Sequence, residues 1–298
     1  MDHSEIDKLD QMLRGRPKAL ATAQRRLAYD ALGSLFPPAP DVRMQPVIAG
    51  GVPAEWTTTD AADGRSVLMY LHGGGYVYGS LDSHRHLASE LGRAAGAKAL
   101  ALDYRRAPEA PFPAALDDAL AAYKWLLDGG TPAHSIALAG DSAGAGLAVC
   151  LMVRLRELGL PQPTCAFLMS PWTDMKAAGE SFNCNAARDP VVSRELILFC
   201  AQQYLGEGAA DTPLASPIRA DLRGIAPLTI FVGSTETMLD DSVQLARAAG
   251  LADVPVRLEI WPGMFHIWPT YHQMLGEGRR ALGVAGGIIR QALDRGVA

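Results

Sequence analysis

The sequence has 298 residues, of which 49% are hydrophobic and 20% are charged, the balance of an ordinary folded globular protein. It carries 27 basic and 32 acidic residues and therefore a formal net charge of −5. A mildly acidic chain does not attract phosphate backbones or anionic lipids, so nucleic-acid binding and membrane-surface binding are both disfavoured.

Membrane insertion and metal binding are also disfavoured by the sequence. No apolar run approaches the roughly 18 residues needed to span a bilayer. The first residues lack the basic stretch and apolar core of a secretory signal, so we expect a cytoplasmic protein. The four cysteines form no CxxC pair and the seven histidines no HxxxH pattern, so we expect no metal site.

Residues 1–40 carry two amphipathic helical patterns followed by a proline-rich connector. The first pattern places Ile6, Leu9, Met12 and Leu13 at helical spacing, and the second extends over residues 20–35. The connector at residues 36–40 contains three prolines and cannot continue a helix. We predict that residues 1–40 are an N-terminal helical lid segment.

From residue 41 to residue 298 the pattern changes to short apolar runs that alternate with helices. The predicted strands lie at residues 67–71, 97–102, 135–139, 165–169, 228–232 and 256–261. The predicted helices lie at residues 84–95, 114–127, 143–158, 239–249 and 276–293. Strands that are apolar on both faces and interleaved with helices indicate an α/β domain with a mainly parallel sheet covered on both sides.

Residues 179–212 interrupt this alternation and contain a helical pattern of their own, at about residues 193–205. In parallel sheets the loops after the strands share one edge, and functional sites lie at that edge. We predict that this stretch is an insertion over that edge, joined by the N-terminal helices as a lid.

A candidate nucleophile lies between the strand at 135–139 and the helix that follows it. The segment reads Gly140-Asp141-Ser142-Ala143-Gly144. In a sharp strand-to-helix turn the central serine adopts a strained conformation, and the flanking glycines avoid clashes within the turn. The pattern therefore predicts that the Ser142 hydroxyl is exposed at the sheet edge. The alternative is a glycine-rich turn with a solvated serine.

A glycine-rich loop follows the strand at 67–71 and reads His72-Gly73-Gly74-Gly75. Uncovered backbone amides can stabilise the negative charge that develops on a carbonyl oxygen during acyl transfer. We predict the N–H groups of Gly74, Gly75 and Ala143 as the oxyanion donors, with His72 as a brace for the loop. A flexible turn and a phosphate cradle are the alternatives, although no GxxxxGK[ST] pattern accompanies the loop.

A serine nucleophile needs a base, and histidine is suited to that task near neutral pH. His266 follows the last predicted strand, and the loop after the preceding strand contains Glu236. Asp240 and Asp241 lie farther along, in the first turn of a predicted helix, and are the second and third choices for the acid. The chain order Ser142, Glu236, His266 agrees with the order found in nucleophile-elbow hydrolases.

These segments together resemble a known family. The two glycine-containing motifs, the His266 loop, the segment 103–109 (DYRRAPE), the segment 112–115 (FPAA) and Ser170-Pro171-Trp172 resemble the hormone-sensitive-lipase-like (bacterial family IV) esterases of the α/β-hydrolase superfamily. These segments follow the family's order over about residues 65–270. The residues His72, Gly73, Gly140, Asp141 and Gly144 match the family's motifs around the nucleophile and the oxyanion loop.

The resemblance implies an eight-stranded, mostly parallel sheet, a helical lid and hydrolysis of short- to medium-chain acyl esters without a cofactor. Many members of the family carry aspartate where this chain has Glu236, so the longer side chain must be accommodated. The segment 103–109 is expected to support the site loops. A homodimer through the last strand and helix is common in the family.

Two other functions remain open at this point. A non-catalytic ligand receptor on the same fold is one, although such relatives usually lack the histidine base that His266 supplies. A hydrolase with another bond preference, namely a lactonase, an amidase or a deacetylase, is the other, because the same triad serves all of them. Tyr76, Trp172, Phe182, Met264 and Phe265 are candidates either for a substrate pocket or for ordinary core packing.

Overall fold

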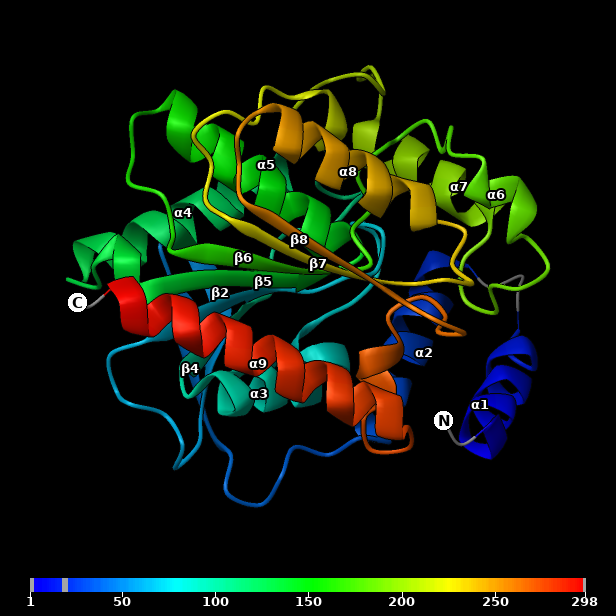
Figure 1. The fold of residues 1–298 in the computed structure, drawn as a ribbon, viewed down its shortest axis with the longest axis horizontal. Coiled ribbons are helices and arrows are strands. Elements are labelled where there is room, and N and C mark those ends of the chain that lie inside the picture. Colours follow the sequence, from blue (N-terminus) through cyan, green and yellow to red (C-terminus); the bar gives the residue numbers. More distant parts are fainter. Residues whose placement is uncertain (1–2, 18–20, 297–298) are drawn as a thin grey trace.

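The computed structural model describes residues 3–17 and 21–296 and contains one eight-stranded sheet with helices on both faces (Figure 1). The strands are β1 (Arg43–Ala49), β2 (Val52–Thr58), β3 (Val67–Leu71), β4 (Lys98–Leu102), β5 (Ile136–Asp141), β6 (Cys165–Met169), β7 (Leu228–Gly233) and β8 (Val256–Trp261). Their spatial order is β1-β2-β4-β3-β5-β6-β7-β8, and all neighbours from β4 to β8 are parallel. The predicted α/β class and the eight-stranded, mostly parallel sheet are therefore confirmed.

Helices cover both faces of the sheet, and others lie at one end of it (Figure 1). Their bounds are α1 (His3–Arg14), α2 (Thr22–Ser34), α3 (Leu81–Ala95), α4 (Ala114–Asp128), α5 (Ala143–Glu157), α6 (Ser181–Cys184), α7 (Arg194–Leu205), α8 (Leu239–Leu251) and α9 (Gly276–Gly296). Helices α3 and α9 pack together on one face, and α4, α5 and α8 cover the other (Figure 1). None of the helices among the described residues is long and apolar enough to span a membrane.

The core consists of two apolar layers separated by the sheet. Strand β3 is wholly buried, and its side chains alternate between the layers: Val67, Met69 and Leu71 face one layer, whereas Leu68 and Tyr70 face the other. This alternation follows from the two-residue period of a β-strand. It explains why the central strands read as continuous apolar runs in the sequence.

The six strands predicted from apolar runs all form, but the pattern did not reveal β1 and β2. These two strands form an antiparallel hairpin, and β2 pairs with β4 at the edge of the parallel part. In β1, Gln45 and Pro46 separate Met44 from the short apolar stretch at residues 47–49, so this strand lacks an apolar run as long as those of the central strands. Helix α3 also begins earlier than predicted, because Ser80 caps it by accepting a hydrogen bond from the Ser83 amide at 3.2 Å.

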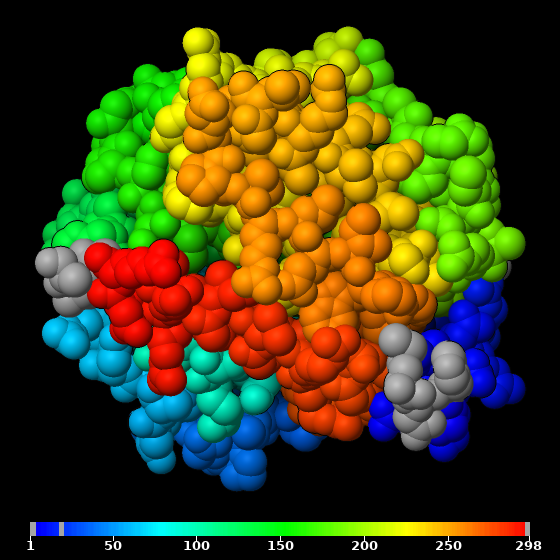
Figure 2. Space-filling view, viewed as in Figure 1, coloured from blue at the N-terminus to red at the C-terminus, as the bar shows by residue number. Residues whose placement is uncertain are grey.

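The N-terminal helices and the insertion at residues 179–212 lie at the same end of the sheet. Figure 1 shows α1, α2, α6 and α7 there, and in Figure 2 the blue N-terminal segment meets the yellow-green insertion. The Arg14 guanidinium donates to the carbonyl oxygens of Ala187 and Arg188, which joins α1 to the insertion. Leu20, where the second helical pattern begins, lies outside the described residues.

Candidate active site

Ser142 occupies a sharp turn between a strand and a helix. Strand β5 ends at Asp141 and α5 begins at Ala143, so Ser142 is the only residue between them. Its backbone has φ 52° and ψ −119°, in a region that residues with a side chain rarely adopt. A Cβ on Gly144 would lie 2.0 Å from the Leu71 carbonyl oxygen, so only glycine fits that position. The turn that the sequence pattern predicts is therefore present.

The structure brings Ser142, His266 and Glu236 together in one hydrogen-bonded row. The His266 Nε2 atom lies 3.0 Å from the Ser142 Oγ atom, and His266 Nδ1 lies 2.9 Å from the Glu236 Oε2 atom. An ionised carboxylate only accepts hydrogen bonds, so Nδ1 carries the proton and Nε2 is free to accept one from the serine. This arrangement is the geometry that a base-activated serine requires.

Glu236 is fully buried, and its longer side chain is accommodated by two further donors. Its Oε1 atom accepts hydrogen bonds from the Ser170 hydroxyl at 2.7 Å and from the Gly233 amide. Ser170 Oγ in turn accepts a hydrogen bond from the Ile267 amide at 3.2 Å, so it joins the acid to the His266 loop. Ser170 was noted in the sequence only as part of a family motif. Its role in holding Glu236 depends on a contact between residues 66 positions apart.

The two other carboxylates considered from the sequence point elsewhere. The Asp240 Oδ2 atom accepts a hydrogen bond from the Ser181 amide, and Asp241 Oδ2 accepts from the amides of Thr173 and Asp174. Both therefore anchor backbone segments. Among the described residues, Glu236 is the carboxylate that is hydrogen bonded to His266.

The electrostatic environment of His266 and Glu236 makes the imidazole more basic. Burial alone would lower the pKa of His266, but the hydrogen bond and the charge of Glu236 outweigh burial and raise that pKa above its ordinary value. Burial raises the pKa of Glu236, while His266 and the Gly233 amide oppose that rise. Because three donors surround the Glu236 carboxyl group, the site is built for its ionised form.

The glycine-rich loop lies beside the nucleophile because β3 and β5 are neighbouring strands, with Leu71 opposite Gly140. Gly74 and Gly75 both have positive φ, at 108° and 64°. In the part of the chain that the structure describes, the N–H groups of Gly74, Gly75 and Ala143 donate to no other protein group. They are therefore available to a bound oxygen.

His72 holds the first of these amides in place. Its Nδ1 atom lies 2.8 Å from the Gly73 carbonyl oxygen, which shares a planar peptide with the Gly74 amide. Burial lowers the pKa of His72 to about 3, so the ring is neutral and donates from Nδ1. The ring also stacks on Tyr104, with 4.2 Å between centroids. The predicted role of His72 as a brace agrees with these contacts.

Asp141 connects the loop to the nucleophile turn. Its Oδ1 atom accepts hydrogen bonds from the Gly73 amide at 2.9 Å and from the Tyr70 hydroxyl at 2.6 Å, and its Oδ2 atom lies 3.4 Å from His84 Nε2. Burial would raise the pKa of Asp141, but His84 and the Tyr70 hydroxyl reverse that effect and lower it. This buried carboxylate thus fixes the loop that precedes Gly74.

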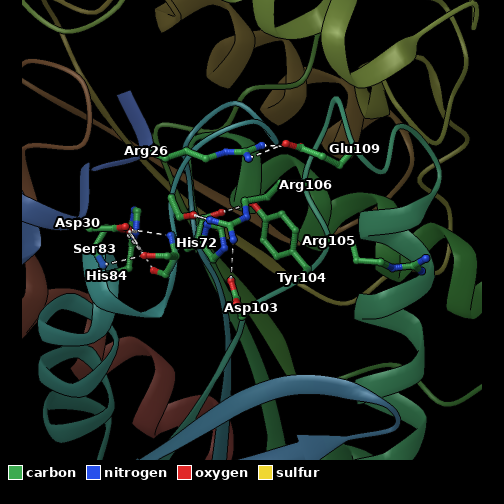
Figure 3. Close-up of polar contacts among 12 residues, drawn as sticks. Arg26, Asp30, His72, Ser83, His84, Asp103, Tyr104, Arg105, Arg106 and Glu109 are labelled. Atoms are coloured by element: carbon green, nitrogen blue, oxygen red, sulfur yellow. Dashed lines mark hydrogen bonds and ion pairs between the residues drawn. The ribbon is translucent and has the colours of Figure 1, made fainter. Parts of the chain in front are cut away.

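The segment Asp103–Glu109 wraps around the outside of the glycine-rich loop (Figure 3). The Tyr104 hydroxyl donates to the His72 carbonyl oxygen at 2.7 Å, the Ala107 amide donates to the Tyr76 carbonyl oxygen at 2.9 Å, and Arg106 donates to the Gly79 carbonyl oxygen. These bonds hold three carbonyl groups between residues 72 and 79, in the glycine-rich loop and the residues after it, which is consistent with the supporting role predicted for this segment.

The aromatic and methionine residues considered for a pocket are all buried. Met264 and Phe265 belong to the apolar layer beneath α9, whereas Tyr76, Trp172 and Phe182 belong to the other layer. The Tyr76 ring stacks on Tyr204 of α7, with 3.8 Å between centroids. Packing accounts for Met264 and Phe265, and Tyr76 connects the glycine-rich loop to the insertion.

Comparisons with known proteins agree with this fold and site. A family model for the α/β-hydrolase fold matches residues 68–270. An acetyl-hydrolase of Streptomyces hygroscopicus is 49% identical over 92% of this chain and 91% of its own length. An ethyl acetate hydrolase of Pseudomonas putida is 33% identical over 75% of this chain and 72% of its own length.

Solved structures give the same result. The crystal structure of an esterase from the bacterial hormone-sensitive lipase family superposes with a TM-score of 0.95 and 43% identity, covering 97% of this chain and 98% of that one. The chain therefore belongs to the α/β-hydrolase family, among the hydrolases that are similar to bacterial hormone-sensitive lipase.

Proposed function

We propose that the protein is a serine carboxylesterase that hydrolyses short- to medium-chain acyl esters through an acyl-enzyme intermediate. The observation that carries this proposal is the row of contacts in which His266 Nε2 lies 3.0 Å from Ser142 Oγ while His266 Nδ1 lies 2.9 Å from Glu236. Two relatives are named acetyl-hydrolase and ethyl acetate hydrolase, and these names support a small acyl group as the substrate of this protein. The intact histidine base disfavours a non-catalytic receptor.

In the first half of the reaction, Ser142 Oγ attacks the ester carbonyl carbon while His266 Nε2 takes the hydroxyl proton. The ionised Glu236 stabilises the imidazolium that forms. The N–H groups of Gly74, Gly75 and Ala143 bind the oxyanion of the tetrahedral intermediate. His266 then donates its proton to the leaving alkoxide oxygen, which releases the alcohol and leaves the acyl group on Ser142.

In the second half, a water molecule attacks the acyl carbon and gives a proton to His266. The second tetrahedral intermediate uses the same three amides. It collapses when His266 returns the proton to Ser142 Oγ, and the carboxylic acid leaves. The proton balance closes over the cycle, so the serine and the histidine are restored to their starting forms.

We also propose that residues 1–40 and the insertion at 179–212 form a lid over a catalytic domain that comprises residues 41–298. The bonds from Arg14 to the insertion and the stacking of Tyr204 on Tyr76 support this division.

The homodimer and the cytoplasmic location stay predictions. Strand β8 supports the dimer, because it lies at the edge of the sheet and its Ile260 side chain is exposed.

The experiment that tests the function is the substitution Ser142→Ala. We expect turnover of p-nitrophenyl acetate to fall to background while the melting temperature stays within a few degrees of the unmodified protein. Ser34→Ala, at an exposed position on α2, is the matched control and retains full activity. Turnover by a folded Ser142→Ala protein would reject the proposal.

A panel of acetate, octanoate, lactone and anilide substrates, assayed with the unmodified protein, then separates an esterase from a lactonase or an amidase.

A further inference from the structure

Helix α2 contacts residues 77–80, which follow the glycine-rich loop, and Arg26 makes several of these contacts. The Arg26 Nε atom donates to the Val77 carbonyl oxygen at 2.8 Å, and its Nη2 atom donates to the Ala107 carbonyl oxygen at 2.8 Å. Both Nη atoms also bind the Glu109 carboxylate, at 2.8 and 2.7 Å. Figure 3 shows Arg26 reaching across the loop to Glu109. A segment far from the triad in sequence thus holds a carbonyl group that lies two residues after Gly75 in the chain.

The consequence of this contact follows from the planarity of peptide groups. In a trans peptide, the C=O of one residue and the N–H of the next point in opposite directions. The Val77 carbonyl points to Arg26, so the Tyr78 amide points the other way, and it donates to the Gly74 carbonyl oxygen at 2.8 Å. The Gly74 carbonyl shares its peptide with the Gly75 amide. Two rigid peptide groups therefore separate Arg26 from an amide of the candidate oxyanion hole.

Two neighbours of Arg26 reinforce the contact between the helix and the loop. Tyr29 stacks on Tyr78, with 5.6 Å between ring centroids, and Asp30 accepts a hydrogen bond from the Ser80 hydroxyl at 2.5 Å. Arg26, Tyr29 and Asp30 are three and four residues apart and so share one face of the helix. This face of α2 therefore lies along residues 77–80 and contacts them.

The ion pair with Glu109 alone does not explain why Arg26 is placed here. The Glu109 side chain is 64% exposed, and exposed ion pairs contribute little to stability. The bond to the Val77 carbonyl oxygen differs from this ion pair, because it fixes the peptide group between Val77 and Tyr78. Lysine could not replace the arginine fully, because the guanidinium supplies donors in three directions at once.

We propose that Arg26 is a positioning residue of the oxyanion hole. Together with the Val77 amide, which also donates to the Gly74 carbonyl oxygen at 3.1 Å, helix α2 then sets the direction of the Gly75 amide in addition to covering the site. This inference rests on the proposed function. Arg26 does not touch substrate. It acts through the Val77 and Gly74 peptide groups, and its removal weakens the binding of the developing oxyanion more than the binding of the ester.

The test compares four variants on p-nitrophenyl acetate and on a trifluoromethyl ketone. The ketone forms a tetrahedral adduct with the nucleophile and so reports on the oxyanion hole. We expect Arg26→Met to lower kcat by about tenfold to a hundredfold, less than the loss of a whole oxyanion donor. The ketone inhibition constant rises by a similar factor, whereas KM changes little. Arg26→Lys recovers part of both losses.

Glu109→Gln and Arg105→Met are the controls. Glu109→Gln removes the charge but leaves Arg26 bonded to Val77, so kcat changes by no more than about threefold. Arg105 belongs to the same segment and binds Asp118 through two nitrogens, but it points away from the loop (Figure 3). Arg105→Met therefore leaves kcat and ketone binding unchanged.

The outcomes separate this inference from the proposed function. An unmodified protein without ester hydrolysis would overturn both. An active protein whose Arg26→Met variant binds the ketone normally would overturn the inference alone, whatever the change in melting temperature. Equal losses in Arg26→Met and Glu109→Gln would also overturn it, because they would assign the effect to the ion pair. If Arg26→Met does not fold, Arg26→Lys takes its place in the test. We then expect kcat and ketone affinity to fall in parallel, and normal ketone affinity in Arg26→Lys would overturn the inference.

Discussion

The substitution Glu236→Gln tests how the candidate triad works, because the structure dictates where each atom of the glutamine must lie. The Glu236 Oε1 atom sits between two donors, the Ser170 hydroxyl and the Gly233 amide. The glutamine oxygen has to take that position, since an NH₂ group there would face the Gly233 N–H. The NH₂ group then replaces Oε2, which lies 2.9 Å from His266 Nδ1.

A donor at that position reverses the tautomer of His266. Nδ1 must give up its proton to accept the new hydrogen bond, so the proton moves to Nε2, which faces Ser142 at 3.0 Å. A protonated Nε2 cannot take the serine proton. In serine proteases the equivalent change lowers kcat by about 10⁴-fold, which corresponds to about 5.5 kcal/mol in the activation free energy. We expect a loss of the same order here.

The assay is steady-state hydrolysis of p-nitrophenyl acetate, together with thermal unfolding. Because glutamine can keep the bond to the Gly233 amide, we expect the melting temperature to change by only a few degrees. Glu236→Asp is the matched control: it keeps the charge and the tautomer but is one methylene shorter, so its kcat lies between those of the other two proteins. A Glu236→Gln protein with more than about a tenth of the original kcat would refute the tautomer argument.

Two further predictions concern the surroundings of the same pair. Ser170→Ala removes a hydrogen bond to a buried carboxylate and leaves the Ile267 amide without its acceptor, so urea unfolding should show a loss of about 1.5–3 kcal/mol. An unchanged unfolding free energy would contradict that role. The acid limb of kcat/KM reports the pKa of His266 in the free enzyme, and only the neutral form accepts a proton. Since Glu236 raises that pKa, activity should fall as pH decreases, with a midpoint above 6.5 in the original protein and a lower midpoint in Glu236→Gln. A midpoint below 6.5 in the original protein would count against the pairing.

The sequence predicted the parallel part of the fold because burial on both faces leaves a local signal. Strands such as β3 and β6 are apolar throughout, and in the helices between the strands the apolar residues recur every three to four positions. The hairpin of β1 and β2 left no such signal. Strand β1 lies at the edge of the sheet, is largely exposed and contains Pro46, which an edge strand tolerates.

The sequence also identified Ser142, Glu236 and His266 as candidates, because each follows a predicted strand and their order is that of a known class of hydrolase. It left Asp240 and Asp241 open as the acid. The direction of a side chain within a loop depends on its hydrogen-bond partners, and those partners lie far away in the chain. Asp240 faces Ser181 and Asp241 faces Thr173, whereas Glu236 faces His266.

What the sequence alone determined, then, is the set of elements and the residue types that follow them. The tertiary structure alone decided which groups support the site: Ser170 meets Glu236 across 66 positions, and Arg26 meets Val77 across 51. The physical reason is the range of the interactions. Periodic burial is encoded within a few residues, whereas a hydrogen bond between two loops exists only after the sheet has placed their ends side by side.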